Sequence, residues 1–452
     1  MNAIRRYGSA ALLAATVSTL TFGTASATEG YFSNGFGARQ KALAGAGVAD
    51  SRDATAGALN PAGLTHVYGT EIDFSVSAFA PVRGYSGDPG PGLTPTGEFE
   101  SGREFFFIPN VAWSSDAYKN SLFDVVGISL VGNGGMNTAF SGNSICGFAG
   151  PGPFCGGTAG VNLLQMFMSV AFAKQVAPGI SIGVAPILAA QVFEAKGLGL
   201  FAAFPGVTTD PTSLVPGGQN DWSFGGGVRA GIEIAPMRNV RIGVSGTTPI
   251  WMQKFEQYRG LFANGGEFDI PASIQAGIAV DVTPQLTLMA DWRYIWYSGV
   301  DAISNPSTNA FNCPGLGFGG IDPTQCFGGT NGPGFGWSDI NVVKLAAEYR
   351  HSDKLTLRAG YAWNENPVSS RDAHLNILAP GVVQHHITAG FQYDLGGGYH
   401  LEMAGMFAPN NTVRGDDLFG PPGNNRVEIE MYQYEVTAGI KYKFGEPDAP
   451  LK

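Results

Sequence analysis

Hydrophobic and polar residues alternate with a period of two over most of the chain, which is the pattern of β-strands with one apolar and one polar face. Near residue 74, for example, Ile72 and Phe74 share one face, while Asp73 and Ser75 share the other. The same division recurs in segment after segment. The pattern predicts 14 strands, centred near Val76, Phe107, Ile128, Val170, Val184, Val228, Val244, Ile278, Ala290, Leu345, Leu357, Ala389, Met403 and Thr437.

Alternation alone also fits a soluble β-sandwich, so the lengths of strands and connections decide the fold class. Most of the segments run about ten residues or more, which is what a tilted strand needs to cross a bilayer. Their connections alternate between short and long, from the two residues Thr283-Pro284 to the stretch between Asp301 and Trp337. Short turns at one end and long loops at the other are typical of outer-membrane barrels. We therefore expect an all-β protein with a 14-stranded antiparallel transmembrane β-barrel over residues 69–444.

Composition agrees with a membrane barrel. Charged residues make up 14% of the chain, against roughly 25% in a soluble domain, while glycine numbers 66 and aromatic residues reach 12%. The net charge is −10 and no basic stripe is visible, which argues against nucleic acid as a partner.

The first 27 residues read as a secretory leader. Arginines at positions 5 and 6 precede an apolar stretch and the small residues Ala25-Ser26-Ala27. A membrane anchor is the alternative, but it needs about 20 uninterrupted apolar residues. We expect a signal peptide over 1–27, location in a Gram-negative outer membrane, and a short tail over 445–452 after the last strand.

Four cysteines fall as two close pairs in sequence rich in glycine and proline. In an exported protein this spacing predicts two local disulfides that hold loops, Cys146–Cys155 and Cys313–Cys326. Metal binding is the alternative, but neither pair has CxxC spacing or a neighbouring histidine. No metal or other cofactor is expected.

Residues 28–68 precede the first strand and read as helix and turn. They are too apolar for a free linker, because side chains such as Phe32, Phe36 and Leu43 would be exposed. A barrel of 14 strands leaves a channel unless something fills it. We therefore expect residues 28–68 to form a small N-terminal helical hatch that plugs the lumen.

This segment resembles the hatch of the FadL family (OMPP1/FadL/TodX) of outer-membrane transporters for long-chain fatty acids or aromatic hydrocarbons. The resemblance rests on GYFSNGFG, KALAGAGVA and the Asn60-Pro61-Ala62 turn in DATAGALNPAGL. Later segments also resemble the family: GNGGMNT at 132–138, IPASIQAGIAVDVTPQLTLMADWRYIWYS at 270–298 and LRAGYAWNENPV at 357–368.

The resemblance implies a channel rather than an enzyme. External loops would capture a hydrophobic small molecule, the hatch would gate its passage, and a kinked strand would release it laterally into the lipid of the outer membrane. Such a ligand prefers acyl chains to water, so this route spares it a wet lumen. Nothing in the sequence demands more than a monomer.

The resemblance also directs attention to particular residues. The turn that would hold the hatch is Asn60, Pro61 and Ala62. Candidates for the floor of a substrate pocket, with hatch-to-wall packing as the alternative, are Phe32, Phe36, Leu43 and Leu59. Candidates for a capture groove, with loop packing or a strand extension as the alternatives, are Leu198, Leu200, Phe201 and Phe204.

Inward-facing cations could neutralise a carboxylate head group, and alternation predicts four of them: Arg229, Arg293, Lys344 and Arg358. The alternative is an inward lattice of ion pairs with Asp281, Asp291, Glu233 and Glu348. The third strand is our candidate for the lateral opening, because Gly127 and Gly132 are places where ladder pairing could fail.

Two other functions compete with hydrophobic transport. A hydrophilic porin or an adhesin-type barrel would share the strands, and its hatch would be only a constriction. An outer-membrane hydrolase would need a nucleophile and a histidine in register, but no GxSxG elbow or Ser/His/Asp spacing accompanies the six histidines.

Overall fold

A computed structural model describes residues 29–444 except 103–104, 141–144, 147–149, 152–157, 199–205, 215–217 and 419. The predicted leader and the C-terminal tail lie outside the described residues. So does Cys155, the second partner of the first predicted disulfide.

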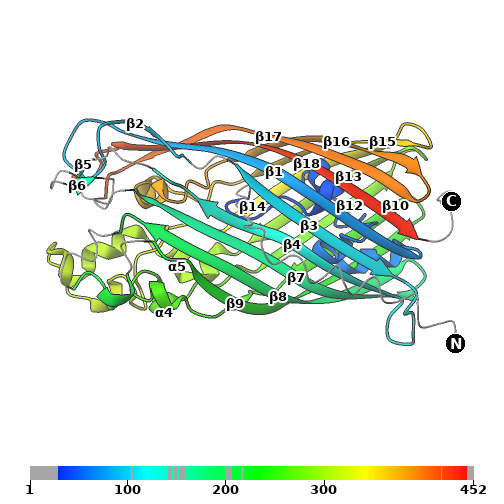
Figure 1. Ribbon diagram of the computed structural model, residues 1–452, viewed down its shortest axis with the longest axis horizontal. Coiled ribbons are helices and arrows are strands. Elements are labelled where there is room, and N and C mark those ends of the chain that lie inside the picture. The colour runs from blue at the N-terminus through cyan, green and yellow to red at the C-terminus, as the bar shows by residue number, and fades with distance from the viewer. Residues whose placement is uncertain are drawn as a thin grey trace.

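Fourteen long strands form one closed antiparallel sheet (Figure 1). Each of the 14 predicted centres falls within one of them, so the predicted barrel is confirmed. The barrel strands are β1 (Thr70–Gly87), β3 (Phe106–Ser115), β4 (Val125–Asn137), β7 (Gly160–Ala177), β8 (Ile180–Lys196), β9 (Asp221–Met237), β10 (Val240–Thr247), β12 (Ser273–Asp281), β13 (Leu286–Ile295), β14 (Ile340–Arg350), β15 (Leu355–Asn364), β16 (His385–Gly396), β17 (Tyr399–Gly415) and β18 (Val427–Phe444).

The first and last strands close the barrel. Strand β1 pairs with β18 over its whole length, from Thr70 opposite Phe444 to Gly87 opposite Val427. Four short strands lie outside the main wall or extend it: β2 (Gly97–Glu100), β5 (Ile145–Cys146), β6 (Gly150–Pro151) and β11 (Trp251–Met252).

The two faces of the sheet are reversed relative to a soluble protein. On β1 the polar residues Asp73 and Ser75 are buried, whereas the side chain of Phe74 is 47% exposed. In a soluble antiparallel sheet the apolar face would be the buried one. Here the apolar face points outward, as it must if lipid surrounds the wall.

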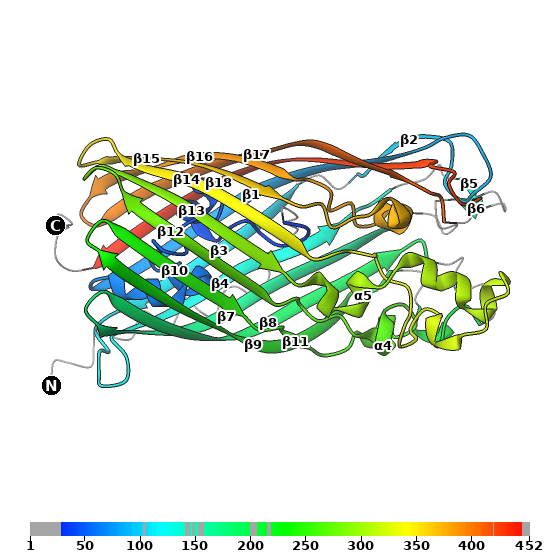
Figure 2. The ribbon, with the colours of Figure 1, turned by 180° about the vertical axis from the view of Figure 1, so that it is seen from behind.

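The two ends of the barrel differ. The short turns lie at one end, while the long loops and most of the short helices lie at the other (Figures 1 and 2). No helix among the described residues is long and apolar enough to cross a bilayer. The helices of the long loops are η2 (Pro211–Ser213), η3 (Glu256–Tyr258), α4 (Ala263–Gly266), η4 (Tyr297–Gly299), α5 (Asp301–Ser304), η5 (Ser307–Asn312), η6 (Pro314–Leu316), η7 (Pro323–Gln325), η8 (Ser370–Asp372) and η9 (Leu375–Ile377).

The long loops pack on one another around aromatic and aliphatic side chains and are tied together by buried polar groups. Cys313 and Cys326 form a disulfide, so the second predicted pair is confirmed. The Asp417 carboxylate accepts hydrogen bonds from the backbone N–H groups of Leu93 (3.1 Å) and Thr94 (2.5 Å), and lies 3.4 Å from His374 Nδ1. This one side chain therefore joins three loops.

The pKa of Asp417 reflects these contacts. Burial alone would raise the pKa, but the hydrogen bonds that His374 and Thr94 make to the carboxylate hold the pKa below the ordinary value. A depressed pKa means that the carboxylate stabilises the loops above about pH 4, and that this contribution is lost as the pH falls through the folded-state pKa.

We expect Asp417→Asn to loosen the loop cap while the barrel stays intact. The change weakens the contacts with His374 and Arg426 in a buried site, which costs about 1–3 kcal/mol. Limited proteolysis of intact cells should cleave the external loops faster in the variant. The control is Asp353→Asn, since Asp353 is exposed in a short turn at the opposite end. Equal cleavage rates in both variants would contradict the role assigned to Asp417.

Candidate functional site

The N-terminal segment lies inside the barrel. It contains α1 (Gly37–Ala42), α2 (Ala56–Leu59) and η1 (Pro61–His66), and Figures 1 and 2 show these helices enclosed by the strands. All residues from 29 to 64 are buried except Arg52 and Leu59, which are half-buried. We call residues 29–66 the hatch from here on.

Asn60 organises the turn between α2 and η1. Its side-chain oxygen accepts a hydrogen bond from Ala62 N (3.1 Å) and so caps η1, which begins at Pro61. Its amide nitrogen donates to the carbonyl of Val48 (2.7 Å) and to that of Ile232 on β9 (3.2 Å). One side chain thus connects the turn to the rest of the hatch and to the wall.

Inward-facing glycines of the wall make room for the hatch backbone. A Cβ at Gly231 would lie 2.0 Å from Asn60 Oδ1, and one at Gly183 would lie 2.4 Å from the carbonyl carbon of Pro61. Gly243 and Gly360 are in equally close contact with hatch backbone. Since a larger residue would clash at these positions, the glycines form a seat shaped for this segment.

Ion pairs also hold the hatch to the wall. Arg39 Nε lies 3.0 Å from Glu348, Lys41 Nζ lies 2.8 Å from Glu435, and the ring of His66 lies 2.5 Å from Glu233. All three wall carboxylates point into the lumen. No group of three or more His, Cys, Asp or Glu within the described parts of the chain is placed to hold a metal ion.

Three of the four predicted inward cations have carboxylate partners. Arg358 lies 2.8 Å from Glu348 and 2.9 Å from Glu402. Arg293 Nη1 and Lys344 Nζ both bind Glu29 of the hatch, at 2.8 Å and 2.5 Å.

Arg229 is the exception. Within the described residues it forms no ion pair, and its hydrogen bond runs from Nε to Thr247 Oγ1 (3.0 Å) although its side chain is buried. Of the four acids that were the alternative partners of these cations, Glu348 does pair with Arg358. The other three have different partners: Asp281 binds Arg241, Glu233 binds His66, and Asp291 accepts hydrogen bonds from the backbone N–H groups of Gly47 and Val48.

A small cavity lies between the hatch and the wall, and Arg229 forms part of its lining together with Arg293 and Lys344. Phe36 and Leu59 contribute apolar surface from the hatch side. Its free volume is about 30 Å³, room for about two water molecules. We call it the cationic cavity.

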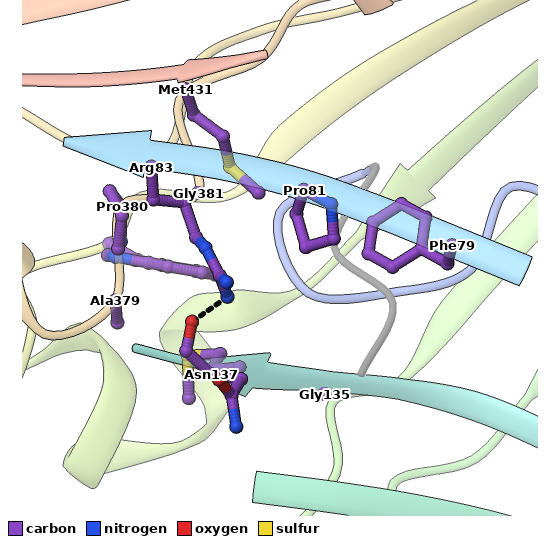
Figure 3. Close-up of a pocket in the computed structure, with 11 residues that line it drawn as sticks. Phe79, Pro81, Arg83, Gly135, Asn137, Ala379, Pro380, Gly381 and Met431 are labelled. Atoms are coloured by element: carbon purple, nitrogen blue, oxygen red, sulfur yellow. Dashed lines mark hydrogen bonds between the residues drawn. The ribbon is translucent and has the colours of Figure 1, made fainter. Parts of the chain in front are cut away.

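A second cavity lies between the wall and the loops. Figure 3 shows Phe79 and Pro81 on β1, with Asn137 on β4 accepting a hydrogen bond from Arg83 through its carbonyl. Met136, Met431 and Trp337 complete an apolar lining. The free volume is about 10 Å³, room for about one water molecule, so both cavities are small. We call it the apolar cavity.

The wall is interrupted between β3 and β4. Their pairing ends at Asn110 opposite Val131, although β4 continues to Asn137 and β3 starts at Phe106. The register of β4 against β7 also shifts between Gly132 and Gly134. The remaining part of β4 therefore lacks its neighbour on one side.

The first residues of the hatch take up that position. Ser33 N donates to the carbonyl of Asn133 (2.7 Å), and Gly135 N donates to the carbonyl of Tyr31 (3.0 Å). Phe32 and Gly134 form a β-bridge. The N-terminal segment of the hatch thus pairs with β4 where β3 does not.

An aromatic cluster supports this segment. The rings of Tyr31 and Phe32 lie 5.6 Å and 6.0 Å from the ring of Tyr297, which in turn lies 5.1 Å from Trp337. The Tyr297 hydroxyl donates to the carbonyl of Glu29 (2.6 Å). These packed rings fix the path of the chain between the two cavities.

The other residues proposed from the sequence have varied positions. Gly132 lies at the interruption, whereas Gly127 is paired on both sides and provides space for Leu64. Leu43 packs with Ala279 and Met289 and lines neither cavity. Leu198 is buried in the loop core, and Leu200, Phe201 and Phe204 lie outside the described residues.

Sequence reasoning missed several residues at this site. Glu29, Tyr31, Asn133, Tyr297 and Trp337 all take part in closing it, and they come from four separate parts of the chain. Asn133 lies in the motif GNGGMNT at 132–138, but the motif alone does not mark this asparagine as a partner of the hatch. Nothing local marks Trp337.

Comparison with solved structures shows the same fold. The toluene transporter TodX of Pseudomonas putida aligns with a TM-score of 0.63 at 15% identity, over 92% of this chain and 100% of that one. A FadL homologue of Pseudomonas aeruginosa gives 0.64 at 15% identity, with the same coverage. The toluene transporter TbuX of Ralstonia pickettii gives 0.59 at 16% identity, over 91% and 99%.

Direct comparison with curated protein sequences finds no match. The model of one protein family, outer membrane protein transport protein (OMPP1/FadL/TodX), matches residues 14–405, which is most of the chain. With the closed 14-stranded barrel, this match shows that the chain belongs to the OMPP1/FadL/TodX family of the Gram-negative outer membrane.

Proposed function

We propose that this protein is a passive channel for hydrophobic small molecules, long-chain fatty acids or hydrocarbons, gated by its hatch and open laterally to the bilayer. The observation that carries the proposal is the interruption between β3 and β4, which the first residues of the hatch cover. A gate at a gap in the wall suits a substrate that leaves into lipid.

The apolar cavity supports the first half of the route. Phe79, Met136, Met431 and Trp337 offer a hydrocarbon-like surface beneath the loops. Each methylene that leaves water gains about 0.8 kcal/mol, so a chain that enters this surface and then the bilayer moves downhill without an energy source. Relatives of the same fold include two toluene transporters, which agrees with this chemistry.

A hydrophilic porin is the main alternative, and the size of the cavities argues against it. The cationic cavity has room for about two water molecules and the apolar cavity for about one, which is far less than a hydrated pore needs at either place. A substrate that passed through either cavity would have to displace neighbouring residues, which fits a gated channel.

The first test is uptake. Expression in a strain without its own fatty-acid or hydrocarbon transporter should accelerate uptake of radiolabelled palmitate, toluene or both relative to an empty vector. Conductance of the purified protein in planar bilayers should stay low. Unchanged uptake of both probes, together with a large steady conductance, would replace the proposal with a porin.

The second test concerns the head group. Arg229 borders the cationic cavity without a carboxylate partner among the described residues, so a charged head group can pair with it. We expect Arg229→Met to slow palmitate uptake about tenfold, the effect of one lost charge-assisted contact, while toluene uptake stays the same. Arg229→Lys should restore part of the rate.

The matched control is Arg350→Met, which removes an exposed arginine at the end of β14. Equal losses for palmitate and toluene in Arg229→Met would show that the residue only supports the fold.

A further inference from the structure

The cationic cavity has more positive than negative side chains around it. Arg229, Arg293 and Lys344 all line it, and the only carboxylate at ion-pair distance from any of them, among the described residues, is that of Glu29. Glu29 belongs to the hatch and is fully buried. One carboxylate from the hatch therefore forms ion pairs with two of these three cations of the wall.

Glu29 also stands directly before the residues that close the wall. Tyr31 and Ser33 make the backbone hydrogen bonds to β4, and the Tyr297 hydroxyl fixes the Glu29 carbonyl. Movement of the Glu29 carboxylate away from Arg293 and Lys344 would remove two charge-assisted contacts that anchor this short stretch. The remainder of the hatch keeps its own ion pairs, such as Arg39 with Glu348.

We propose that Glu29 acts as an internal stand-in for the head group of an acidic substrate. An amphiphile with a single carboxylate would meet Arg229 first, then take over Arg293 and Lys344 from Glu29. The displaced residues 29–33 would leave the edge of β4 and open the interruption beside β3. This inference rests on the proposed transport function and adds to it a residue that determines specificity for acidic substrates, Glu29.

Exchange of the Glu29 carboxylate for the substrate carboxylate involves only a small difference in free energy, so it can be reversed. One carboxylate replaces another at Arg293 and Lys344, so those contacts change little in free energy. The added contact with Arg229 and the burial of the acyl chain favour the substrate. A ligand shifts a gate only by its difference in affinity between the closed and open states, and these two terms supply that difference. A neutral chain of equal length lacks the contact with Arg229.

A cysteine introduced in place of Ser33 can report the position of the segment. Ser33 is 3% exposed in the closed state, and cysteine differs from serine by one atom. In Ser33→Cys protein in native outer membranes, a thiol-reactive maleimide should label slowly. Palmitate should accelerate labelling about tenfold or more, while hexadecan-1-ol should not, because only the acid competes with Glu29.

In the double variant Ser33→Cys/Glu29→Gln, labelling should be fast without palmitate, since a neutral amide no longer holds Arg293 and Lys344 as a carboxylate does. The matched control is Ser33→Cys/Glu348→Gln, because Glu348 also lies between two cations, Arg39 and Arg358, but away from residues 29–33. Its labelling should remain slow. Heat-modifiable migration on gels checks that every variant forms a folded barrel.

Slow labelling in the double variant with Glu29→Gln, or equal acceleration by palmitate and hexadecan-1-ol, would overturn the inference. That result is separable from failure of the proposed function. If wild-type cells take up palmitate or toluene but the thiol of the Ser33→Cys variant stays protected, the channel stands and only the role of Glu29 falls. If neither probe is taken up, the transport proposal itself fails.

Discussion

Charge compensation inside the lumen is the constraint on which the rest of the structure depends. Lipid surrounds the barrel, so each strand turns its polar face inward and brings charged side chains into a narrow interior. The wall does not balance these charges alone, since Glu435 pairs with Lys41 of the hatch and Glu348 with Arg39. The hatch is therefore part of the electrostatic core of the protein, and its seating is specified by pairs of defined geometry.

Shape adds to charge in fixing the hatch. Close approach of backbone to backbone at Gly183, Gly243 and Gly360 leaves no layer of side chains between the hatch and the wall at those positions. The body of the hatch is thus held from several sides at once. Its first residues are held differently, by a few hydrogen bonds to β4, by the two ion pairs of Glu29 and by the rings of Tyr297 and Trp337. This difference in attachment is the reason why we propose residues 29–33 as the moving part of the gate and the rest of the hatch as its fixed body.

The 14 strands of the wall could be predicted from the sequence, because apolar and polar residues alternate over long segments and the connections alternate between short and long. The Asn60 turn was predictable for a similar reason, since its main contact with Ala62 lies two residues away. The partners of Glu29 could not be inferred, because Arg293 is 264 residues distant and only the closed barrel brings it near. The lateral interruption shows the same limit within one strand: Gly127 and Gly132 look alike in sequence, yet one is paired on both sides and the other lies at the gap. Which glycine interrupts the ladder depends on where β3 stops and on what the hatch places beside β4.

The seam between β1 and β18 has a consequence for biogenesis. The hatch is synthesised before any strand, but β18 carries Glu435 and Lys441, which bind Lys41 and Asp53 of the hatch. The strand made last therefore completes the cylinder and secures the segment made first. Closure of the wall therefore coincides with completion of the contacts of the hatch, so a chain that stalls before β18 would have an open edge and would lack the ion pairs of Lys41 and Asp53.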